Sequence, residues 1–276
     1  MKTVIIANPA SGRFNKDKLN RCADILNKNI GDVTVKYTAK PGDARFIAAE
    51  SGADMVIAAG GDGLINETAA GIAKEQLFSA LPFGTVNVFC REFGIPLNPV
   101  KAAINLNTGR TKKIPLGFLG DRPFVLMCGF GYDAQVVKQV VEKGYRRYKT
   151  IAHCIEGVLS LAAPYPELTV HANGRSFNAR HIIISLGQRY AGSFILSKKI
   201  KTGALNIFIQ QDKHSSTLLR TILSVAIGGG FPKAPVYAAV AKISGTFSCQ
   251  LDGEYINTGS DQNYVYVKNS AFTIAF

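Results

Sequence analysis

The chain has 276 residues, 47% of them hydrophobic, and a formal net charge of +13. A chain of this size and apolarity can bury one large core or two modest ones, which excludes a disordered or fibrous protein. No segment approaches the roughly 20 apolar residues of a membrane-spanning helix, and the apolar run at the N-terminus is too short for a secretory signal. We therefore expect a soluble, cytoplasmic protein whose charge favours anionic partners.

The first third of the chain alternates short apolar segments with segments of helical length and period. The apolar segments predict strands at residues 4–7, 33–37, 55–59 and 77–81. Strands that alternate with helices are typical of a parallel sheet with helices on both faces. We therefore expect a doubly wound α/β domain over residues 1–116.

After about residue 116 the pattern becomes that of a largely antiparallel β domain, expected over residues 117–269. Turn residues separate strand-like segments at 168–172, 176–185, 204–210, 236–243 and 264–268. Two helical insertions are expected, at about 134–162 and 215–226. The boundary is expected near 113–120, and the last strand, about 270–276, is left free to return to the first domain.

The cysteines and one basic cluster bear on function only weakly. The five cysteines lie singly, without a CxxC pair, and are expected to be buried small hydrophobes: Cys22, Cys90, Cys128, Cys154 and Cys249. In KGYRRYK, residues 143–149, two tyrosines alternate with cations. This segment fits either a solvated helix end or a patch at a membrane interface.

Three predicted strand-to-helix turns carry glycine: NPASGR at 8–13, GGDG at 60–63 and FGTVN at 83–87. Ligands of open α/β sheets bind beyond the carboxyl ends of the strands, where all three turns are expected. One such turn can need glycine for its backbone angles alone, but three together favour a nucleotide site. Leu64 and Ile65 stand where a Walker P-loop needs lysine and a hydroxyl, and GGDG is not the dinucleotide fingerprint.

Asp62 lies in the middle of the second turn, where a carboxylate should compete with a phosphate for the helix N-terminus. A divalent cation between the two groups would remove this conflict. Asp62 would then hold Mg²⁺, directly or through water, while the loop N–H groups hold phosphate oxygens, namely those of Gly60, Gly61 and Gly63. The alternative for Asp62 is an ordinary helix N-cap.

GGDGLINETAAGIA, residues 60–73, resembles the GGDGT-x-NE motif of the diacylglycerol kinase catalytic-domain family, which includes bacterial soluble lipid kinases, sphingosine kinases and ceramide kinases. Other segments resemble family segments in the same order, across essentially the whole chain: IIANPASGR, YTAKPGDAR, LPFGTVNVFCREFGIP, FVLMCGFGYDAQVV and LDGEYI. NAD kinases share the superfold and a GGDG loop, but the GT-x-N and DGE segments resemble the lipid kinase branch.

The resemblance implies an α/β nucleotide domain and a β-sandwich domain, with ATP and a lipid hydroxyl meeting in the cleft between them. It implies a lipid kinase that transfers the γ-phosphate of Mg-ATP to a lipid hydroxyl. The residues it implies for ATP contact are Asn8, Thr38, Gly60, Gly61, Asp62, Gly63, Asn66 and Thr85. It makes Asp62 the magnesium ligand and Glu254 the general base. Considered alone, Glu254 also fits a plain hairpin after the turn residues Asp252 and Gly253.

The chain departs from the family pattern at several positions. Leu64 replaces a threonine beside the phosphates, Val88 replaces an aspartate, and Thr202 replaces an aspartate that helps to bind a structural Mg²⁺. Gly187 and Gln188 stand where the family has an asparagine. These changes leave open an alternative function, that of a catalytically weak or inactive homologue that binds nucleotide or lipid.

For partners, we expect a lipid substrate and peripheral contact with the anionic inner face of the membrane, screened by salt. Nucleic acid is not expected, because no RNA-reading motif is present. A diacylglycerol-like acceptor is favoured, while monoacylglycerol, a sphingoid base, a prenol and phosphatidylglycerol stay open. The oligomeric state is not determined by the sequence.

Overall fold

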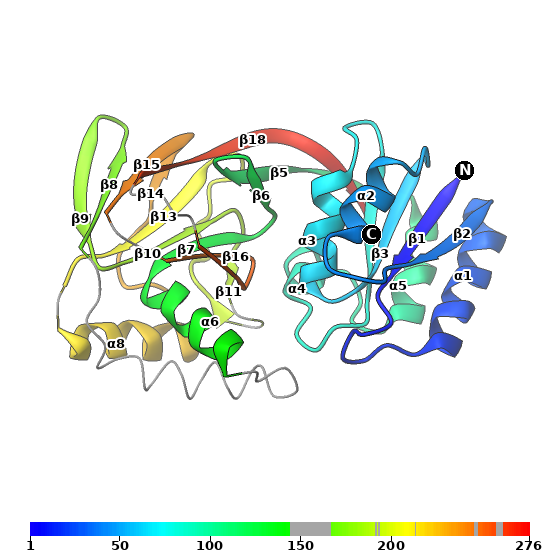
Figure 1. Cartoon of the computed structure of the whole chain (residues 1–276), viewed down its shortest axis with the longest axis horizontal. Coiled ribbons are helices and arrows are strands. Elements are labelled where there is room, and N and C mark those ends of the chain that lie inside the picture. Colours follow the sequence, from blue (N-terminus) through cyan, green and yellow to red (C-terminus); the bar gives the residue numbers. More distant parts are fainter. Residues whose placement is uncertain (144–166, 191, 193, 213, 246–247, 258–261) are drawn as a thin grey trace. The chain divides into compact units, whose positions relative to one another are not determined.

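The computed structural model describes residues 1–143, 167–190, 192, 194–212, 214–245, 248–257 and 262–276 (Figure 1). The chain divides into two compact units, Met1–Leu116 with Asn269–Phe276, and Gly117–Lys268. Within the described residues, every helix is too short or too polar to cross a membrane.

The first unit is a parallel sheet with strand order β2-β1-β3-β4. Its strands are β1 (Thr3–Ala7), β2 (Val33–Tyr37), β3 (Met55–Gly60) and β4 (Leu77–Pro82). Its helices are α1 (Lys16–Ile30), α2 (Asp43–Ala49), α3 (Asp62–Gly71), α4 (Val88–Phe93) and α5 (Pro99–Asn105), followed by the 3₁₀ helix η1 (Leu106–Thr108).

Local sequence accounts for these elements. Every residue of β1 and β3 is buried, as expected for central strands of a sheet that helices cover on both faces. Helix α1 starts at Asn15, whose side chain accepts a hydrogen bond from the N–H of Lys18. It buries Leu19, Cys22 and Leu26, which are spaced three and four residues apart along one face.

The order of the strands creates a switch point between β1 and β3. The chain runs outward from β1 to β2 and then returns past β1 to β3. Since such crossovers are right-handed, α1 and α2 lie on opposite faces of the sheet. In folds of this kind, ligands bind at the carboxyl ends of the strands beside the switch point.

The second unit is a sandwich of two antiparallel layers, β18-β15-β8-β9 and β14-β13-β10-β7-β16-β17. The strands are β6 (Arg122–Phe124), β7 (Met127–Gly131), β8 (Leu168–Ala172), β9 (Arg175–Ala179), β10 (His181–Ser185), β13 (Leu205–Gln210), β14 (Val236–Ala238), β15 (Val240–Ser244), β16 (Cys249–Leu251) and β17 (Glu254–Ile256). A separate pair is β11 (Arg189–Tyr190) with β12 (Phe194–Ile195). The helices are α6 (Tyr132–Glu142) and α8 (Ser215–Ala226), and residues of both units occur in β5 (Thr111–Leu119) and β18 (Gln262–Ala275).

Alternation along the strands separates two cores in this unit. Ile182 and Ile184 of β10 point into the core between the layers, whereas Ile183 points to the opposite face. On that opposite face Ile183 packs with Phe208 of β13 and Val225 of α8. The six-stranded layer is therefore covered on both faces, with α6 and α8 on its helical side (Figure 1).

The fold class expected from the sequence is confirmed, but two predicted strands were wrong. Segment 176–185 is two strands, β9 and β10, which belong to different layers and are separated at Arg180. Segment 236–243 is likewise β14 and β15, again in different layers. In the second segment the apolar residues run on through the break, so its sequence does not reveal the change of sheet. Of the helix expected at 134–162, the described part is α6, and the cluster at 143–149 lies outside the described residues after Lys143.

The described cysteines are buried and carry free thiols, as expected: Cys22, Cys90, Cys128 and Cys249. Burial raises the pKa of Cys22 to about 11 and that of Cys249 to about 12. Such thiols are neutral at physiological pH and unreactive. Cys154 lies outside the described residues.

Candidate functional site

Three glycine turns meet at one edge of the first unit. Ala7 pairs with both Tyr37 and Ala59, so β1, β2 and β3 end at the same level. The N–H of Asn8 donates to Ala59 O at 3.2 Å, and the N–H of Thr38 donates to Ala7 O at 3.0 Å. The residues expected to contact the nucleotide from β1, β2 and β3 are thus neighbours at this edge.

Because glycine has no side chain, the backbones of these turns can come into contact. A Cβ atom on Gly84 would lie 2.5 Å from the Cα of Gly61, so the second and third turns are in backbone contact. A Cβ on Gly12 would lie 3.0 Å from Oγ1 of Thr85. These close approaches bring the glycines of the three turns together in one backbone cluster, here called the glycine surface, in which Cβ atoms at Gly61 and Gly84 would collide with the neighbouring turn.

Asp62 is the first residue of α3, and its carboxylate serves a different helix. Its Oδ1 accepts a hydrogen bond from the N–H of Phe89, at 3.0 Å, in the first turn of α4. Burial raises the pKa of this carboxyl, while the backbone N–H groups of Phe89 and Val88 act in the opposite direction. The N-cap of α3 is Gly61, so the N-cap alternative was wrong about the helix, and Asp62 supports α4 instead.

Asn66 provides a buried acceptor that lacks a partner. Its Oδ1 atom is fully enclosed and, among the described residues, has no hydrogen-bond donor. An unpaired buried oxygen costs about 1–3 kcal/mol, so the position suits a donor from a bound molecule. The next residue, Glu67, accepts from the N–H of Gly42 at 3.0 Å and ties α3 to the start of α2.

Three further residues near the turns, Asn8, Thr85 and Leu64, differ in exposure and in the groups that their side chains contact. Asn8 uses its Oδ1 to accept from the N–H of Ala10 at 2.8 Å, which shapes the first turn. Thr85 is exposed, with its hydroxyl beside that turn. Leu64 is buried and packs on Gly60, since a Cβ there would lie 2.5 Å from Cδ2 of Leu64. An apolar side chain therefore lines the loop where the family pattern has threonine.

In the second unit, Glu254 begins β17 immediately after a tight turn. Asp252 and Gly253 both have positive φ, 49° and 85°, and Leu251 pairs with Glu254 across the hairpin. Positive φ at both central residues is the signature of a type I′ turn. The hairpin alternative is therefore correct as geometry, and it leaves Glu254 exposed rather than buried in the core.

Asp252 anchors the hairpin. Its carboxylate accepts hydrogen bonds from the N–H groups of Val125 (2.6 Å), Leu126 (2.9 Å) and Met127 (2.8 Å). A carboxylate that collects three backbone donors is held firmly, because charge-assisted hydrogen bonds are the strong ones. Nothing in the local sequence separates this role from ordinary turn formation.

A buried hydrogen-bonded chain of polar side chains is joined to the same turn. The sequence did not predict it. Gln250 accepts from the N–H of Gly253 at 2.7 Å and donates to Asp133 Oδ2 at 2.5 Å. The hydroxyl of Tyr190 donates to the other oxygen of Asp133. A signal was available in FGYDAQVV, where an aspartate follows a fully apolar strand.

Thr202 lies exposed in the turn before β13. Asn206 holds this turn, with its Oδ1 accepting from the N–H of Lys201 at 2.8 Å and its Nδ2 donating to Ala204 O at 3.0 Å. Within the part of the chain that the structure describes, no three His, Cys, Asp or Glu side chains gather as a metal site.

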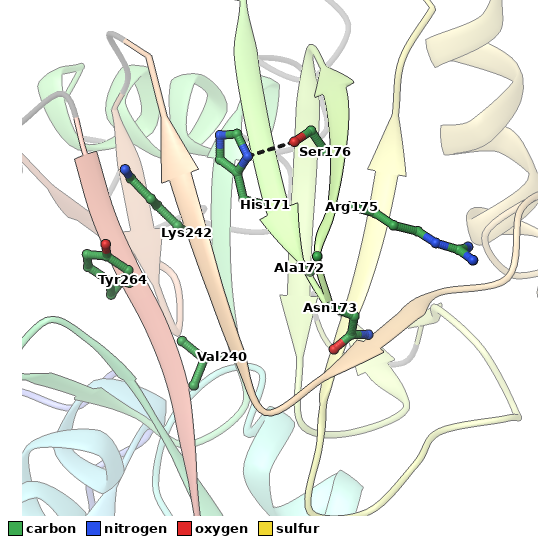
Figure 2. Close-up of a pocket in the computed structure, with 9 residues that line it drawn as sticks. His171, Ala172, Asn173, Arg175, Ser176, Val240, Lys242 and Tyr264 are labelled. Carbon is green, nitrogen blue, oxygen red and sulfur yellow. Dashed lines mark hydrogen bonds between the residues drawn. The ribbon is translucent and has the colours of Figure 1, made fainter.

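A pocket of about 330 Å³ lies elsewhere, on the exposed face of β8, β15 and β18. Figure 2 shows His171, Lys242 and Tyr264 around it, with the side chain of Arg175 directed away. His171 Nδ1 and Ser176 Oγ lie 2.8 Å apart. None of the residues expected to act in catalysis or nucleotide binding lines this pocket.

Comparison with known proteins identifies relatives along the whole chain. The family model described as "Diacylglycerol kinase catalytic domain" matches residues 2–119. The chain is 30% identical over 269 residues to a diacylglycerol kinase of Staphylococcus aureus (strain bovine RF122), covering 91% of this chain and 85% of that protein. It is 26% identical over 280 residues to the Bacillus subtilis diacylglycerol kinase, covering 91% and 89%.

The fold has a close match among solved structures. A diacylglycerol kinase from Bacillus anthracis str. Sterne superimposes with a TM-score of 0.81 at 22% identity, covering 100% of this chain and 96% of that one. At this identity the match supports the fold alone.

Proposed function

The chain belongs to the diacylglycerol kinase family and is a lipid kinase, and on that basis we propose that it transfers the γ-phosphate of ATP to a hydroxyl of a diacylglycerol-like lipid. The observation that carries the proposal is the glycine surface at the edge of the first unit, with the half-buried Asp62 and the unpaired oxygen of Asn66 in the adjoining helix α3. Backbone N–H groups bind phosphate, and a buried acceptor suits a hydroxyl or amino group of a nucleotide.

Phosphoryl transfer depends mainly on positioning and on stabilising charge. The N–H groups of Gly60, Gly61 and Gly63 and the hydroxyl of Thr85 would hold the phosphates, with Asn8 and Thr38 at the same edge. Asp62 would hold Mg²⁺, and water and phosphate oxygens would supply the other ligands. When bound, Mg²⁺ neutralises charge on the migrating phosphoryl group.

Glu254 would accept the proton of the lipid hydroxyl. An exposed carboxylate on a rigid hairpin can reach a substrate, and the anchoring of Asp252 limits its movement. Proton removal makes the hydroxyl oxygen a better nucleophile as it meets the γ-phosphorus.

A second candidate function is that of a nucleotide- or lipid-binding homologue with little catalysis. The observation that favours it is Leu64, whose buried side chain lines the phosphate loop in place of a hydroxyl. Only the rate of transfer separates the two functions, because both retain the binding site.

The test is a lipid panel assay with labelled ATP in detergent micelles, comparing the wild type with Glu254→Gln and Asp62→Asn. Each substitution is expected to lower kcat by about 100-fold or more, in line with the loss of a general base or a charge-stabilising group. Asp121→Asn, at an exposed turn, serves as the control. Wild-type turnover in both variants would remove the mechanism, and binding of ATP without transfer to any lipid would favour the second function.

We also propose that the enzyme works in the cytoplasm, at the anionic inner face of the membrane, and that α8 contacts the lipid. Leu219, Leu223 and Ile227 are spaced four residues apart and are 39%, 52% and 84% exposed. From His214 to Gln250 the sequence contains no aspartate or glutamate, whereas Arg220 lies on the exposed side of α8. An apolar ridge with a cation and no acidic residue is complementary to an anionic leaflet.

A further inference from the structure

A buried hydrogen-bonded chain ends at the residue that precedes Glu254. Gln250 lies in β16 with 2% of its surface exposed, and Asp133 lies in the first turn of α6 with 3% exposed. The Gln250 amide is the central member of these hydrogen bonds. Its Nε2 donates to Asp133 Oδ2, and its Oε1 accepts from the N–H of Gly253. The backbone of the hairpin that carries Glu254 is thus bonded, through Gln250, to a side chain of a different element.

A glycine of the neighbouring strand β7 makes room for the hydrogen bond between Asp133 and Gln250. Gly129 of β7 pairs with Gln250, and a Cβ on Gly129 would lie 1.8 Å from Asp133 Oδ2. The Asp133–Gln250 bond therefore occupies the space of a missing side chain. Tyr190 donates to the second oxygen of Asp133, so both oxygens of the carboxylate are used within the protein.

The direction of the hydrogen bonds follows from chemistry. A carboxylate only accepts, so it must face the NH₂ end of the Gln250 amide. The carbonyl end then points to the N–H of Gly253, which needs an acceptor. Asp133 therefore determines which way the Gln250 amide is turned, and the Gln250 oxygen adds a hydrogen bond to the turn that Asp252 already anchors.

We propose that Asp133 and Gln250 are positioning residues, which hold the Asp252–Gly253 turn so that Glu254 is presented in one place. This inference rests on the proposed function of Glu254 as the general base. A misplacement of about 1 Å can cost about 100-fold in rate. Both oxygens of Asp133 already have donors within the protein, so its part is argued through the turn and not through the substrate.

The sharpest test exchanges the acid and the amide. In Asp133→Asn, an NH₂ group replaces one carboxylate oxygen. If it faces Gln250, two NH₂ groups oppose each other and the Gln250 amide turns round, and if it faces Tyr190, the hydroxyl must change from donor to acceptor and the charge that held both partners is gone. In Gln250→Glu, two carboxylates adjoin in a buried site and repel each other. In the double variant, the carboxylate introduced at position 250 can accept from the Gly253 N–H and from the amide introduced at position 133. The oxygen of that new amide is then free to accept from Tyr190.

We expect each single variant to lower kcat by about 10- to 100-fold with an unchanged KM for ATP, and the double variant to recover most of the loss. Gln250→Met, which keeps the size but makes no hydrogen bond, should behave like the single variants, and unlike Gln250→Glu it introduces no second carboxylate beside Asp133. Failure of the double variant to recover, when its thermal stability equals that of the wild type, would overturn the positioning role.

A second readout does not depend on catalysis. Hydrogen exchange of the Gly253 amide, followed by NMR, should be slow in the wild type, faster in Asp133→Asn and Gln250→Met, and slow again in the double variant. Unchanged exchange in Gln250→Met, which cannot accept from the Gly253 N–H, overturns the inference whatever the activity. If the wild type phosphorylates no lipid, it is the proposed function that fails. The exchange pattern then still decides whether the hydrogen bonds of Asp133 and Gln250 hold the turn.

Discussion

At Asp62, burial of the carboxyl opposes its ionisation, whereas the proposed binding of Mg²⁺ needs the ionised form. Burial raises the pKa of its carboxyl above the value in the unfolded chain, so between these two pKa values the folded state binds more protons than the unfolded state. The free energy of unfolding therefore falls as the pH rises through that window, and the favourable contribution is complete only below the unfolded pKa. At neutral pH, ionisation of this carboxyl costs more free energy in the folded protein than in the unfolded chain.

Asp62→Asn should consequently stabilise the protein more at pH 7 than at pH 4, because asparagine does not ionise and its oxygen can still accept from Phe89. Each kcal/mol gained corresponds to a rise of about 2–4 °C in Tm. Thermal unfolding followed by circular dichroism in the presence of a chelator measures the difference, with Asp121→Asn as an exposed control. An equal difference at both pH values would contradict the role of burial.

A substitution at Leu64 distinguishes the two candidate functions, an active kinase and a homologue with little catalysis. Leu64→Thr would place a hydroxyl against the phosphate loop and should raise kcat about tenfold or more, as expected for one hydrogen bond to a charged group. The loss of buried methyl groups should lower the free energy of unfolding by about 2 kcal/mol.

The matched control is Leu64→Val, which has nearly the same shape as threonine but no hydroxyl. It should lose stability in the same way without a gain in kcat. Equal activities of the two variants in the lipid assay would show that the hydroxyl has no part in transfer, and Leu64 would then be compatible with a fully active enzyme.

At the scale of elements, the two sides of α8 differ in their surroundings. Its inner side packs Leu218 against Tyr132 and Val136 of α6, whereas its outer side carries the ridge of Leu219, Leu223 and Ile227. Packing alone explains the inner side. The outer ridge is what an interfacial helix needs, because aliphatic side chains gain free energy at the acyl boundary.

Leu223→Gln is expected to weaken binding to vesicles that contain phosphatidylglycerol about tenfold, since burying a leucine contributes about 1.5–3 kcal/mol. Ile104→Gln on α5 is the matched control, because Ile104 is 51% exposed and Leu223 is 52% exposed. Co-sedimentation measures binding, and the micelle assay should show unchanged kcat for both variants. Equal losses of binding, or a loss caused by a change of oligomeric state, would exclude α8 as the contact.

For the whole molecule, the relevant quantity is the net charge of +13. A protein with this charge should bind anionic vesicles more tightly than neutral ones, because each cation near the surface contributes about 1 kcal/mol. Raising the salt concentration from about 50 mM to about 0.5 M should weaken binding to anionic vesicles by tenfold or more, since the Debye length falls below about 5 Å. Co-sedimentation that depends on neither lipid charge nor salt would refute the electrostatic part of the membrane proposal.

The site was partly predictable. Glycine turns after apolar strands place Asn8, Thr38 and Gly60 at one sheet edge, because parallel strands end at the same edge wherever their pairing register is fixed by burial. The type I′ turn before Glu254 also follows from its local Asp-Gly sequence. The division of segment 236–243 between two layers was not predictable, because both of its halves are apolar, whereas in segment 176–185 the change from the polar SFNAR to the apolar HIIIS was an available signal.

Local sequence was therefore enough to indicate the class of fold and the glycine surface, since each depends on neighbours a few positions away, whereas the roles expected for Asn66 and Glu254 rested on the resemblance to the family. What Asp62 and Asp133 contact could be read only from the packed fold. The partner of Asp62 lies 27 residues further along, and that of Asp133 lies 117 residues further along. Hydrogen bonds over such separations leave no periodic signal in the chain, because they join groups that only the packing of whole elements brings together.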